Sequence, residues 1–158
     1  MFVYDVSMSK VVFFLGIAVA ILFCLYYFGY QLPGLDSLSA PKIKSLVVGD
    51  KTIAVEVVET LAAKKRGLSG RSALADNQGM LFVYIDPGNY SFWMKDMKFA
   101  IDIIWIGDDH RIVDITKELS PDTFPQTFQP KAPAKYVLEV NSGWADRNLV
   151  KIGDLTTF

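Results

Sequence analysis

Residues 101–106 read Ile-Asp-Ile-Ile-Trp-Ile, so all but one of their side chains are apolar. Alternate side chains of a strand point to opposite faces, so positions 101, 103 and 105 share one face and Asp102 shares the other with two isoleucines. Because both faces are apolar, we predict a central strand that is buried on both sides.

Short apolar segments separated by turn residues continue on either side of this strand. We predict strands at 47–48, 53–58, 80–85, 92–94, 101–106, 111–116 and 136–140, and a last short strand after 153–154. A short helix is predicted over 60–68 with Thr60 as its N-cap, and one helical turn over 142–147. The pattern predicts a mainly β fold: a small compact barrel or sandwich with one or two short helices.

Asp102 places a carboxylate in or beside the predicted core. An unpaired charge at such a position is too costly to persist, so the group must be protonated, hydrogen-bonded or paired with a cation. The candidate partners are Arg66, Arg71 and Lys95. A structural ion pair at a strand end and a functional carboxylate both remain open.

A second strand carboxylate, Glu139, occurs in residues 136–140, which read Tyr-Val-Leu-Glu-Val. Two carboxyl groups are what a glycosidase uses as an acid and base pair. The alternative is that Glu139 simply faces water.

Residues 92–96 read Phe-Trp-Met-Lys-Asp and follow a predicted turn. Trp93 is interpreted either as a stacking platform, with Lys95 as a polar contact in a ligand cleft, or as a core tryptophan that closes one end of the barrel. The long loop 120–134 contains four prolines and two phenylalanines, Phe124 and Phe128. We expect it to pack against the domain, over the cleft beside Trp93 or over the barrel end.

Charge and composition exclude several classes of function. The net charge is −1, which is not the signature of a nucleic-acid-binding protein. The basic run 64–66 is interpreted as a solvated helix face rather than a phosphate site. With a single histidine, His110, and no cysteine after Cys24, a Cys–His nucleophile and a multi-histidine metal site are absent from the predicted domain. No cofactor and no metal site are predicted.

Residues 11–30 carry no charged side chain. A helix of twenty residues is about 30 Å long, which matches the hydrocarbon core of a bilayer. We therefore predict a single transmembrane helix over 11–30, after an N-terminal tail (1–10) and before a linker (31–44) and a soluble mainly β domain (45–158). A cleaved signal peptide is the alternative, although its apolar core is usually shorter. Lys10 favours a cytoplasmic N-terminus and an extracytoplasmic domain.

Five segments, in this order and spacing, resemble the domain-of-unknown-function 192 family of prokaryotes: Arg-Gly-Leu-Ser-Gly-Arg at 66–71, Gly-Met-Leu-Phe at 79–82, Phe-Trp-Met-Lys at 92–95, Ile-Asp-Ile-Ile at 101–104 and Tyr-Val-Leu-Glu at 136–139. The resemblance covers about residues 47–154. It implies a compact, mainly β domain that is often exported or membrane-attached. The activity of the family is not established, so it implies no catalytic residues. Asp96 stands where the family usually has asparagine.

Our leading hypothesis is a membrane-anchored extracytoplasmic binding or accessory module at the cell envelope. The candidate cleft residues are Arg66, Arg71, Trp93, Lys95, Asp102, Phe124 and Glu139. One alternative is an envelope hydrolase that uses Asp102 and Glu139, and another is a structural partner of a second membrane protein. The expected partners are the lipid bilayer, through residues 11–30, and an envelope ligand or membrane protein.

Overall fold

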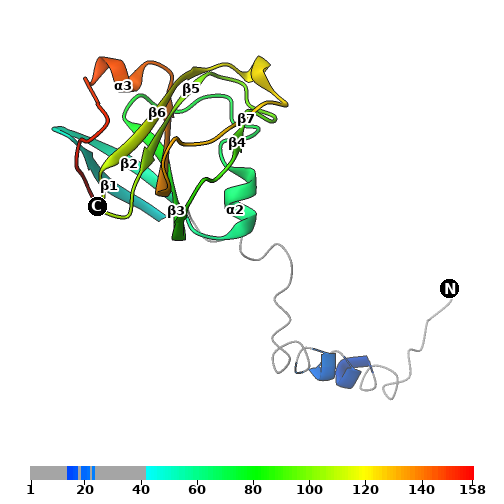
Figure 1. Cartoon of the computed structure of the whole chain (residues 1–158). Helices are drawn as coiled ribbons and strands as arrows, with labels where there is room; N and C mark the ends of the chain where they lie inside the picture. The colour runs from blue at the N-terminus through cyan, green and yellow to red at the C-terminus, as the bar shows by residue number, and fades with distance from the viewer. Residues whose placement is uncertain (1–13, 18, 22, 24–41) are drawn as a thin grey trace. The chain divides into compact units, whose positions relative to one another are not determined.

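The computed structural model describes residues 14–17, 19–21, 23 and 42–158 (Figure 1). The chain divides into two compact units, residues 1–40 and 41–158. The predicted tail, most of the predicted transmembrane helix and most of the predicted linker lie outside the described residues. Among the residues that are described, no helix is both long enough and apolar enough to cross a membrane.

The second unit is mainly β, as predicted. Its elements are β1 (Lys42–Val48), β2 (Lys51–Val58), α2 (Leu61–Arg66), β3 (Gln78–Gly88), β4 (Phe92–Trp93), β5 (Ile101–Ile106), β6 (Ile112–Leu119), the 3₁₀ turn η2 (Pro121–Thr123), β7 (Thr127–Phe128), β8 (Ala134–Asn141), α3 (Trp144–Arg147) and β9 (Thr156–Thr157). Residues 42–44, which the sequence places in the linker, belong to β1.

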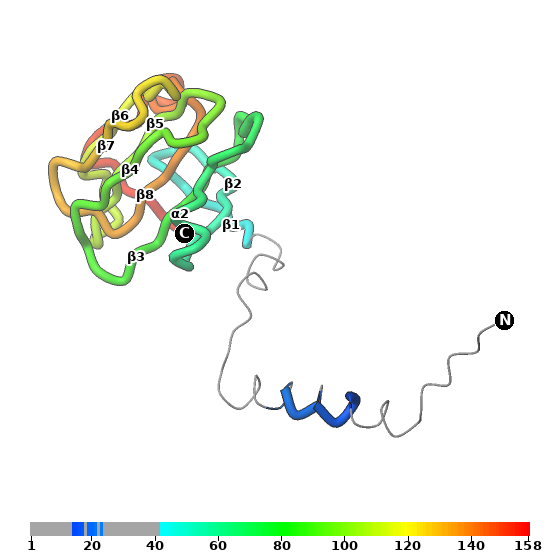
Figure 2. Tube along the Cα trace, turned by 90° about the vertical axis from the view of Figure 1, so that its right-hand side faces the viewer, coloured from blue at the N-terminus to red at the C-terminus, as the bar shows by residue number. Residues whose placement is uncertain are grey.

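Seven strands form one sheet in the order β6-β5-β8-β3-β2-β1-β9, and β4 and β7 form a separate two-stranded ribbon. The large sheet curls into a half-barrel rather than a closed barrel or a two-sheet sandwich (Figures 1 and 2). Only β2 and β3 pair in parallel, across the connection that holds α2, whereas the other paired strands are antiparallel.

The central-strand prediction for residues 101–106 is confirmed. All six residues of β5 are buried, and β5 lies between β6 and β8. Its alternate side chains enter two different cores, with Ile103 and Trp105 in one and Ile104 and Ile106 in the other.

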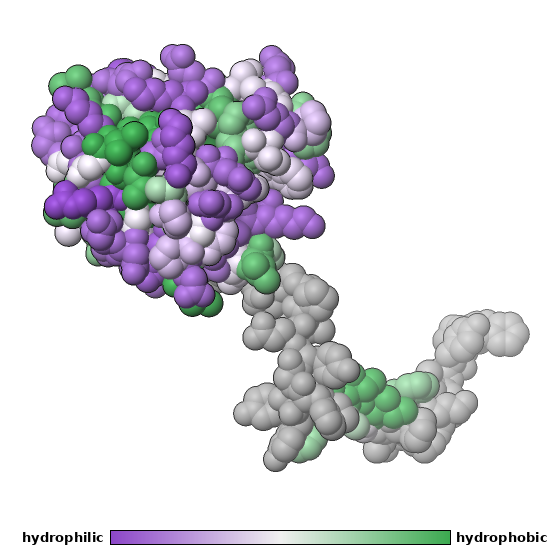
Figure 3. All heavy atoms as spheres, in the orientation of Figure 1, coloured by the Kyte–Doolittle hydropathy of each residue, from purple (hydrophilic) through white to green (hydrophobic). Residues whose placement is uncertain are grey.

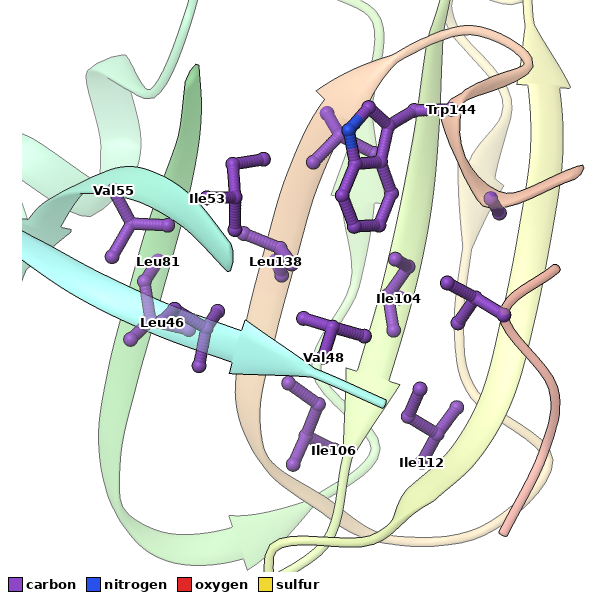
Figure 4. Packing of buried hydrophobic residues seen from close by; sticks show 13 residues of the cluster. Leu46, Val48, Ile53, Val55, Leu81, Ile104, Ile106, Ile112, Leu138 and Trp144 are labelled. Carbon is purple, nitrogen blue, oxygen red and sulfur yellow. The ribbon is translucent and has the colours of Figure 1, made fainter. Parts of the chain in front are cut away.

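One core is enclosed by the curl of the sheet, and we call it the concave-face core. Leu46 and Val48 of β1 belong to the same cluster as Ile112 of β6, although these strands lie far apart in the strand order (Figure 4). Trp144 of α3 packs into the same cluster, with 5% of its surface exposed. Burial of apolar side chains from distant strands explains why the sheet curls.

The other core lies on the opposite side of the sheet, and we call it the convex-face core. Phe92 of β4 makes edge-on contacts with Phe82 of β3 at 4.9 Å and with Trp105 of β5 at 5.4 Å between ring centroids. The ribbon of β4 and β7 therefore covers this face of the sheet.

Hydrophilic residues cover most of the surface of this unit that Figure 3 shows, and apolar residues form separate small groups. The exposed apolar side chains include Leu149, Ile152 and Leu155, which lie between α3 and β9.

Candidate functional site

Glu139 is a buried carboxyl group on the convex face of the sheet. In the register of the sheet it lies between Met80 of β3 and Ile103 of β5, and only 6% of its surface is exposed. Its Oε2 atom has no hydrogen-bond partner in the described part of the chain. Burial raises the pKa of Glu139 to about 8, against an opposing effect of the Arg71 charge. The group is therefore mostly protonated at neutral pH.

A pocket of about 300 Å³ reaches this carboxyl group. Besides Glu139 of β8, its lining comes from three segments: α2 with the turn that follows it, alternate residues of β3, and residues 91–97. These segments approach one another because α2 with the turn that follows it, and the strand β4, both pack on the convex-face core.

The walls of the pocket include the aromatic side chains Tyr84 and Trp93. Tyr84 stacks on Tyr90 with a centroid distance of 3.5 Å and an interplanar angle of 13°. Burial, and then the nearby Tyr90 and Glu139, raise the pKa of Tyr84 to about 12, so its hydroxyl keeps its proton. Trp93 is 46% exposed and meets Phe124 edge-on at 6.2 Å. The alternative of a core tryptophan at position 93 is therefore wrong.

Three basic residues, Lys64, Lys65 and Arg66, line the mouth of the pocket from α2. Lys64 Nζ lies 4.2 Å from the centroid of the Tyr84 ring, and burial lowers its pKa while Glu59 raises it. None of the three forms a salt bridge with a carboxylate in residues 42–158. The basic run 64–66 is interpreted from the sequence as a solvated helix face. Lys65 and Arg66 are indeed exposed, but the three residues also line a pocket, which the sequence pattern did not predict.

The local sequence explains why α2 ends beside the pocket. The Thr60 side chain accepts a hydrogen bond from the Ala63 N–H at 3.2 Å, so the predicted N-cap is confirmed. The helix ends at Gly67, whose φ of +50° is a left-handed conformation that favours glycine. Basic side chains in the last turn also interact favourably with the helix dipole.

Arg71 and Lys95 do not bind Asp102, contrary to the proposed pairing. Arg71 forms a 2.6 Å salt bridge with Glu56 of β2, beside the pocket. Lys95 Nζ lies 5.9 Å from the centroid of the Trp93 ring, and the Lys95 carbonyl accepts a 2.8 Å hydrogen bond from the Ser69 hydroxyl. This hydrogen bond ties the turn after α2 to the segment that carries Trp93.

Asp102 is a structural residue outside the pocket. Its side chain is fully buried and accepts hydrogen bonds from the backbone N–H groups of Glu118 at 2.9 Å, Gly143 at 3.1 Å and Ala145 at 3.0 Å. Three N–H donors satisfy this buried carboxyl group, which forms no salt bridge among residues 42–158. Of the alternatives for this carboxyl group, the hydrogen-bonded one is confirmed, and the ion pair with Arg66, Arg71 or Lys95 is wrong.

The proposed acid and base pair is also wrong. In the pairing of β5 with β8, Asp102 is opposite Val140, and Glu139 is opposite Ile103. The two carboxyl groups therefore lie on opposite faces of the sheet and cannot flank one substrate.

The loop 120–134 packs against the domain beside Trp93, as expected. Its β7 strand pairs with β4, with Thr127 opposite Trp93, and Phe128 packs on the convex-face core. Phe124 remains 45% exposed while it contacts Trp93. The loop thus holds one wall of the pocket in place.

Sequence reasoning missed Tyr84, and it considered Lys64 only as part of a solvated helix face, whereas both residues line the pocket. A signal was present for Tyr84, because it alternates with Met80 and Phe82 along β3 and so shares their face. Lys64 gave no such signal, since its contact with Tyr84 depends on how α2 packs on the sheet. Within the residues described, no three His, Cys, Asp or Glu side chains are grouped so that they could hold a metal ion.

The fold and the site define a mainly β domain made of one curled sheet with a pocket on its convex face. The chain belongs to the DUF192 family, described as "Uncharacterized ACR", which it matches over residues 44–158. The family resemblance seen in the sequence is therefore confirmed.

Two solved structures share the fold. A protein from Sinorhizobium meliloti 1021, described as a candidate transcription regulator, is 25% identical with a TM-score of 0.70, and the match covers 75% of this chain and 95% of that one. A protein of unknown function from Novosphingobium aromaticivorans DSM 12444 is 27% identical with a TM-score of 0.69, and the match covers 81% of this chain and 99% of that one. A search of curated proteins found no match.

Proposed function

We propose that the domain of residues 42–158 is a ligand-binding module and that a small molecule occupies the pocket at Glu139. The observation that carries this proposal is the unpartnered, buried Oε2 atom of Glu139 beside the pocket. A buried polar atom without a hydrogen bond costs about 1–3 kcal/mol, and a ligand that supplied the bond would recover part of this energy.

The remaining lining also suits a ligand. Small-molecule sites combine apolar and aromatic walls with a few polar groups that fix orientation. Here Trp93 supplies aromatic surface, Lys64 supplies a cation, and Glu139 supplies a hydrogen-bonding group. Trp93 is available for contact because nearly half of its surface is exposed.

The domain can be tested without the N-terminal segment. Residues 41–158 form a compact unit with two hydrophobic cores of its own. The two related structures consist of little more than this domain, since the match covers 95% and 99% of their chains.

The experiment screens a library of small organic anions, cations and neutral molecules against residues 41–158 by ligand-observed NMR. We expect hits whose signals are lost in Trp93→Ala and in Glu139→Leu. The matched control is Leu149→Ala, which shortens an exposed apolar side chain away from the pocket. Hits that bind all variants equally, or a screen without hits, would contradict the proposal.

We also propose that residues 11–30 tether this module to a membrane, with the domain on the extracytoplasmic side of the cell envelope. The support is the run of twenty residues without a charged side chain and the position of Lys10 before it. A tethered pocket would meet ligands close to the bilayer surface.

A further inference from the structure

We infer that the pocket selects a small organic anion that places its negative group among Lys64, Lys65 and Arg66, a flat apolar body against Trp93, and an uncharged hydroxyl or amide group at Glu139. This inference rests on the proposed ligand-binding function and adds the chemical class of the ligand.

The mouth of the pocket favours a negative group. Lys64, Lys65 and Arg66 line it, and none of them forms a salt bridge within residues 42–158. Lys64 is half-buried over the Tyr84 ring, so a carboxylate or phosphate that reached it would form a charge-assisted hydrogen bond away from bulk water.

The middle of the pocket favours a flat apolar body. Tyr90 covers one face of the Tyr84 ring, and its hydroxyl donates a 2.6 Å hydrogen bond to the Asp86 carbonyl. Lys64 Nζ lies 4.2 Å from the centroid of the same ring, so the open aromatic face of the pocket is that of Trp93. Trp93 is held by Phe124 and by the pairing of β4 with β7. A volume of about 300 Å³ is at the small end of the range for ligand sites, which suits a single ring with substituents.

The inner end of the pocket favours an uncharged polar group. A ligand ammonium would have to pass three basic side chains, and it would be buried near the positive charge of Arg71, which already acts on Glu139. A protonated carboxyl group, in contrast, can both donate and accept hydrogen bonds with a hydroxyl or an amide. Glu139 thus recognises hydrogen-bonding capacity rather than charge.

The test measures the affinity of residues 41–158 for four matched probes at neutral pH, by equilibrium dialysis. The probes are 4-hydroxyphenylacetate, phenylacetate, which lacks the hydroxyl, tyrosol, which lacks the charge, and tyramine, which carries a positive charge. We expect 4-hydroxyphenylacetate to bind about tenfold more tightly than each of the others, the effect of one charge-assisted or buried hydrogen bond. Added salt should reduce its advantage over tyrosol.

Two sets of variants assign each preference to its residues. The double variant Lys64→Gln, Arg66→Gln should lose the preference for the anion over tyrosol, whereas Lys42→Gln, Lys151→Gln, with the same change in net charge outside the pocket, should keep it. Glu139→Leu should lose the preference for 4-hydroxyphenylacetate over phenylacetate. Glu139→Gln should keep that preference, because glutamine also donates and accepts.

The outcomes separate this inference from the function it rests on. Tightest binding of tyramine, or equal binding of all four probes that depends on Trp93, would overturn the anion class and leave the ligand-binding function standing. If no probe binds at millimolar concentration, the pocket-dependent hits of the library screen decide: hits that are anions support the anion class, and hits that are all neutral or cationic overturn it. If neither experiment shows binding, both proposals are wrong.

Discussion

Glu139 and Asp102 are both buried carboxyl groups on neighbouring strands, and they differ in the partners that the folded chain gives them. Asp102 receives three backbone N–H donors, whereas the Oε2 atom of Glu139 has no partner among the described residues. The three donors satisfy the hydrogen-bonding capacity of Asp102, which explains its structural role. An unsatisfied group beside a pocket is instead a candidate for recognition.

The raised pKa of Glu139 predicts a pH dependence of stability. The folded chain holds this proton more tightly than the unfolded chain, because the pKa rises from 4.5 to about 8 on folding. The stability from this group is therefore complete below pH 4.5, decreases as the pH rises, and is lost above about 8. At about 1.4 kcal/mol per pKa unit, the free energy of unfolding falls by at most about 5 kcal/mol over this range.

Urea unfolding of residues 41–158 at a series of pH values would measure this dependence. Glu139→Gln should flatten the plot of unfolding free energy against pH between pH 4.5 and about 8. Glu59→Gln, which changes an exposed carboxylate, should leave the slope of this plot intact. An unchanged slope in Glu139→Gln would show that Glu139 does not titrate in this range.

At the scale of elements, Asp102 connects β5 to the last residues of β6 and to the start of α3. The helix α3 has only four residues, and its N-cap residue Gly143 supplies no side-chain hydrogen bond. Asp102, which lies on β5, accepts the hydrogen bonds of the Gly143 and Ala145 N–H groups and so acts as the cap of this helix. The short helix that carries Trp144 over the concave-face core is therefore positioned by a residue of the central strand.

We predict that Asp102→Asn destabilises the domain by about 3 kcal/mol, because one amide N–H₂ then faces a backbone donor and the charge-assisted hydrogen bonds are lost. Asp76→Asn, at an exposed position in a turn, is the matched control and should change stability by less than about 0.5 kcal/mol. Chemical denaturation measures both values. A loss for Asp102→Asn that is no larger than the control would contradict the structural role of these hydrogen bonds.

The elements also show what a sequence can predict. The alternation in β5 and the Thr60 cap were predicted correctly, because each depends on residues that are close together in the chain. The donors to Asp102 were not predicted, since they lie 16, 41 and 43 residues away. The pocket was predicted in part, because Trp93, Glu139 and Arg66 line it. Asp102 lies on the opposite face of the sheet, and the other predicted cleft residues, Arg71, Lys95 and Phe124, are not part of the lining.

At the scale of the whole molecule, we predict that residues 41–158 fold independently and that residues 11–30 alone hold the chain at the membrane. The full chain should stay with membranes after an alkaline carbonate wash, and residues 41–158 should be recovered in the soluble fraction. Both should unfold at the same urea concentration, because both cores belong to residues 41–158. Protease added outside intact cells should remove the domain if it is extracytoplasmic.

Two outcomes would contradict this view of the molecule. Release of the full chain by the carbonate wash would exclude a membrane-spanning anchor. A lower unfolding midpoint for residues 41–158 would show that the N-terminal unit stabilises the domain. A variant with lysines at positions 17 and 21 is a suitable control, because two charges within the apolar run should abolish membrane insertion without touching the domain.

The mainly β class, the burial of β5 on both sides, the cap of α2, the family and the expectation of an anchor all follow from the sequence. Each of these depends on periodicity, composition or short motifs, which act over a few residues or are read directly along the chain. The tertiary structure alone decided that Asp102 is structural, that Glu139 lies beside a pocket, and that Lys64 and Tyr84 belong to the same site. These facts depend on strand register and on how α2 and β4 pack on the curled sheet, which bring together residues that are distant in sequence.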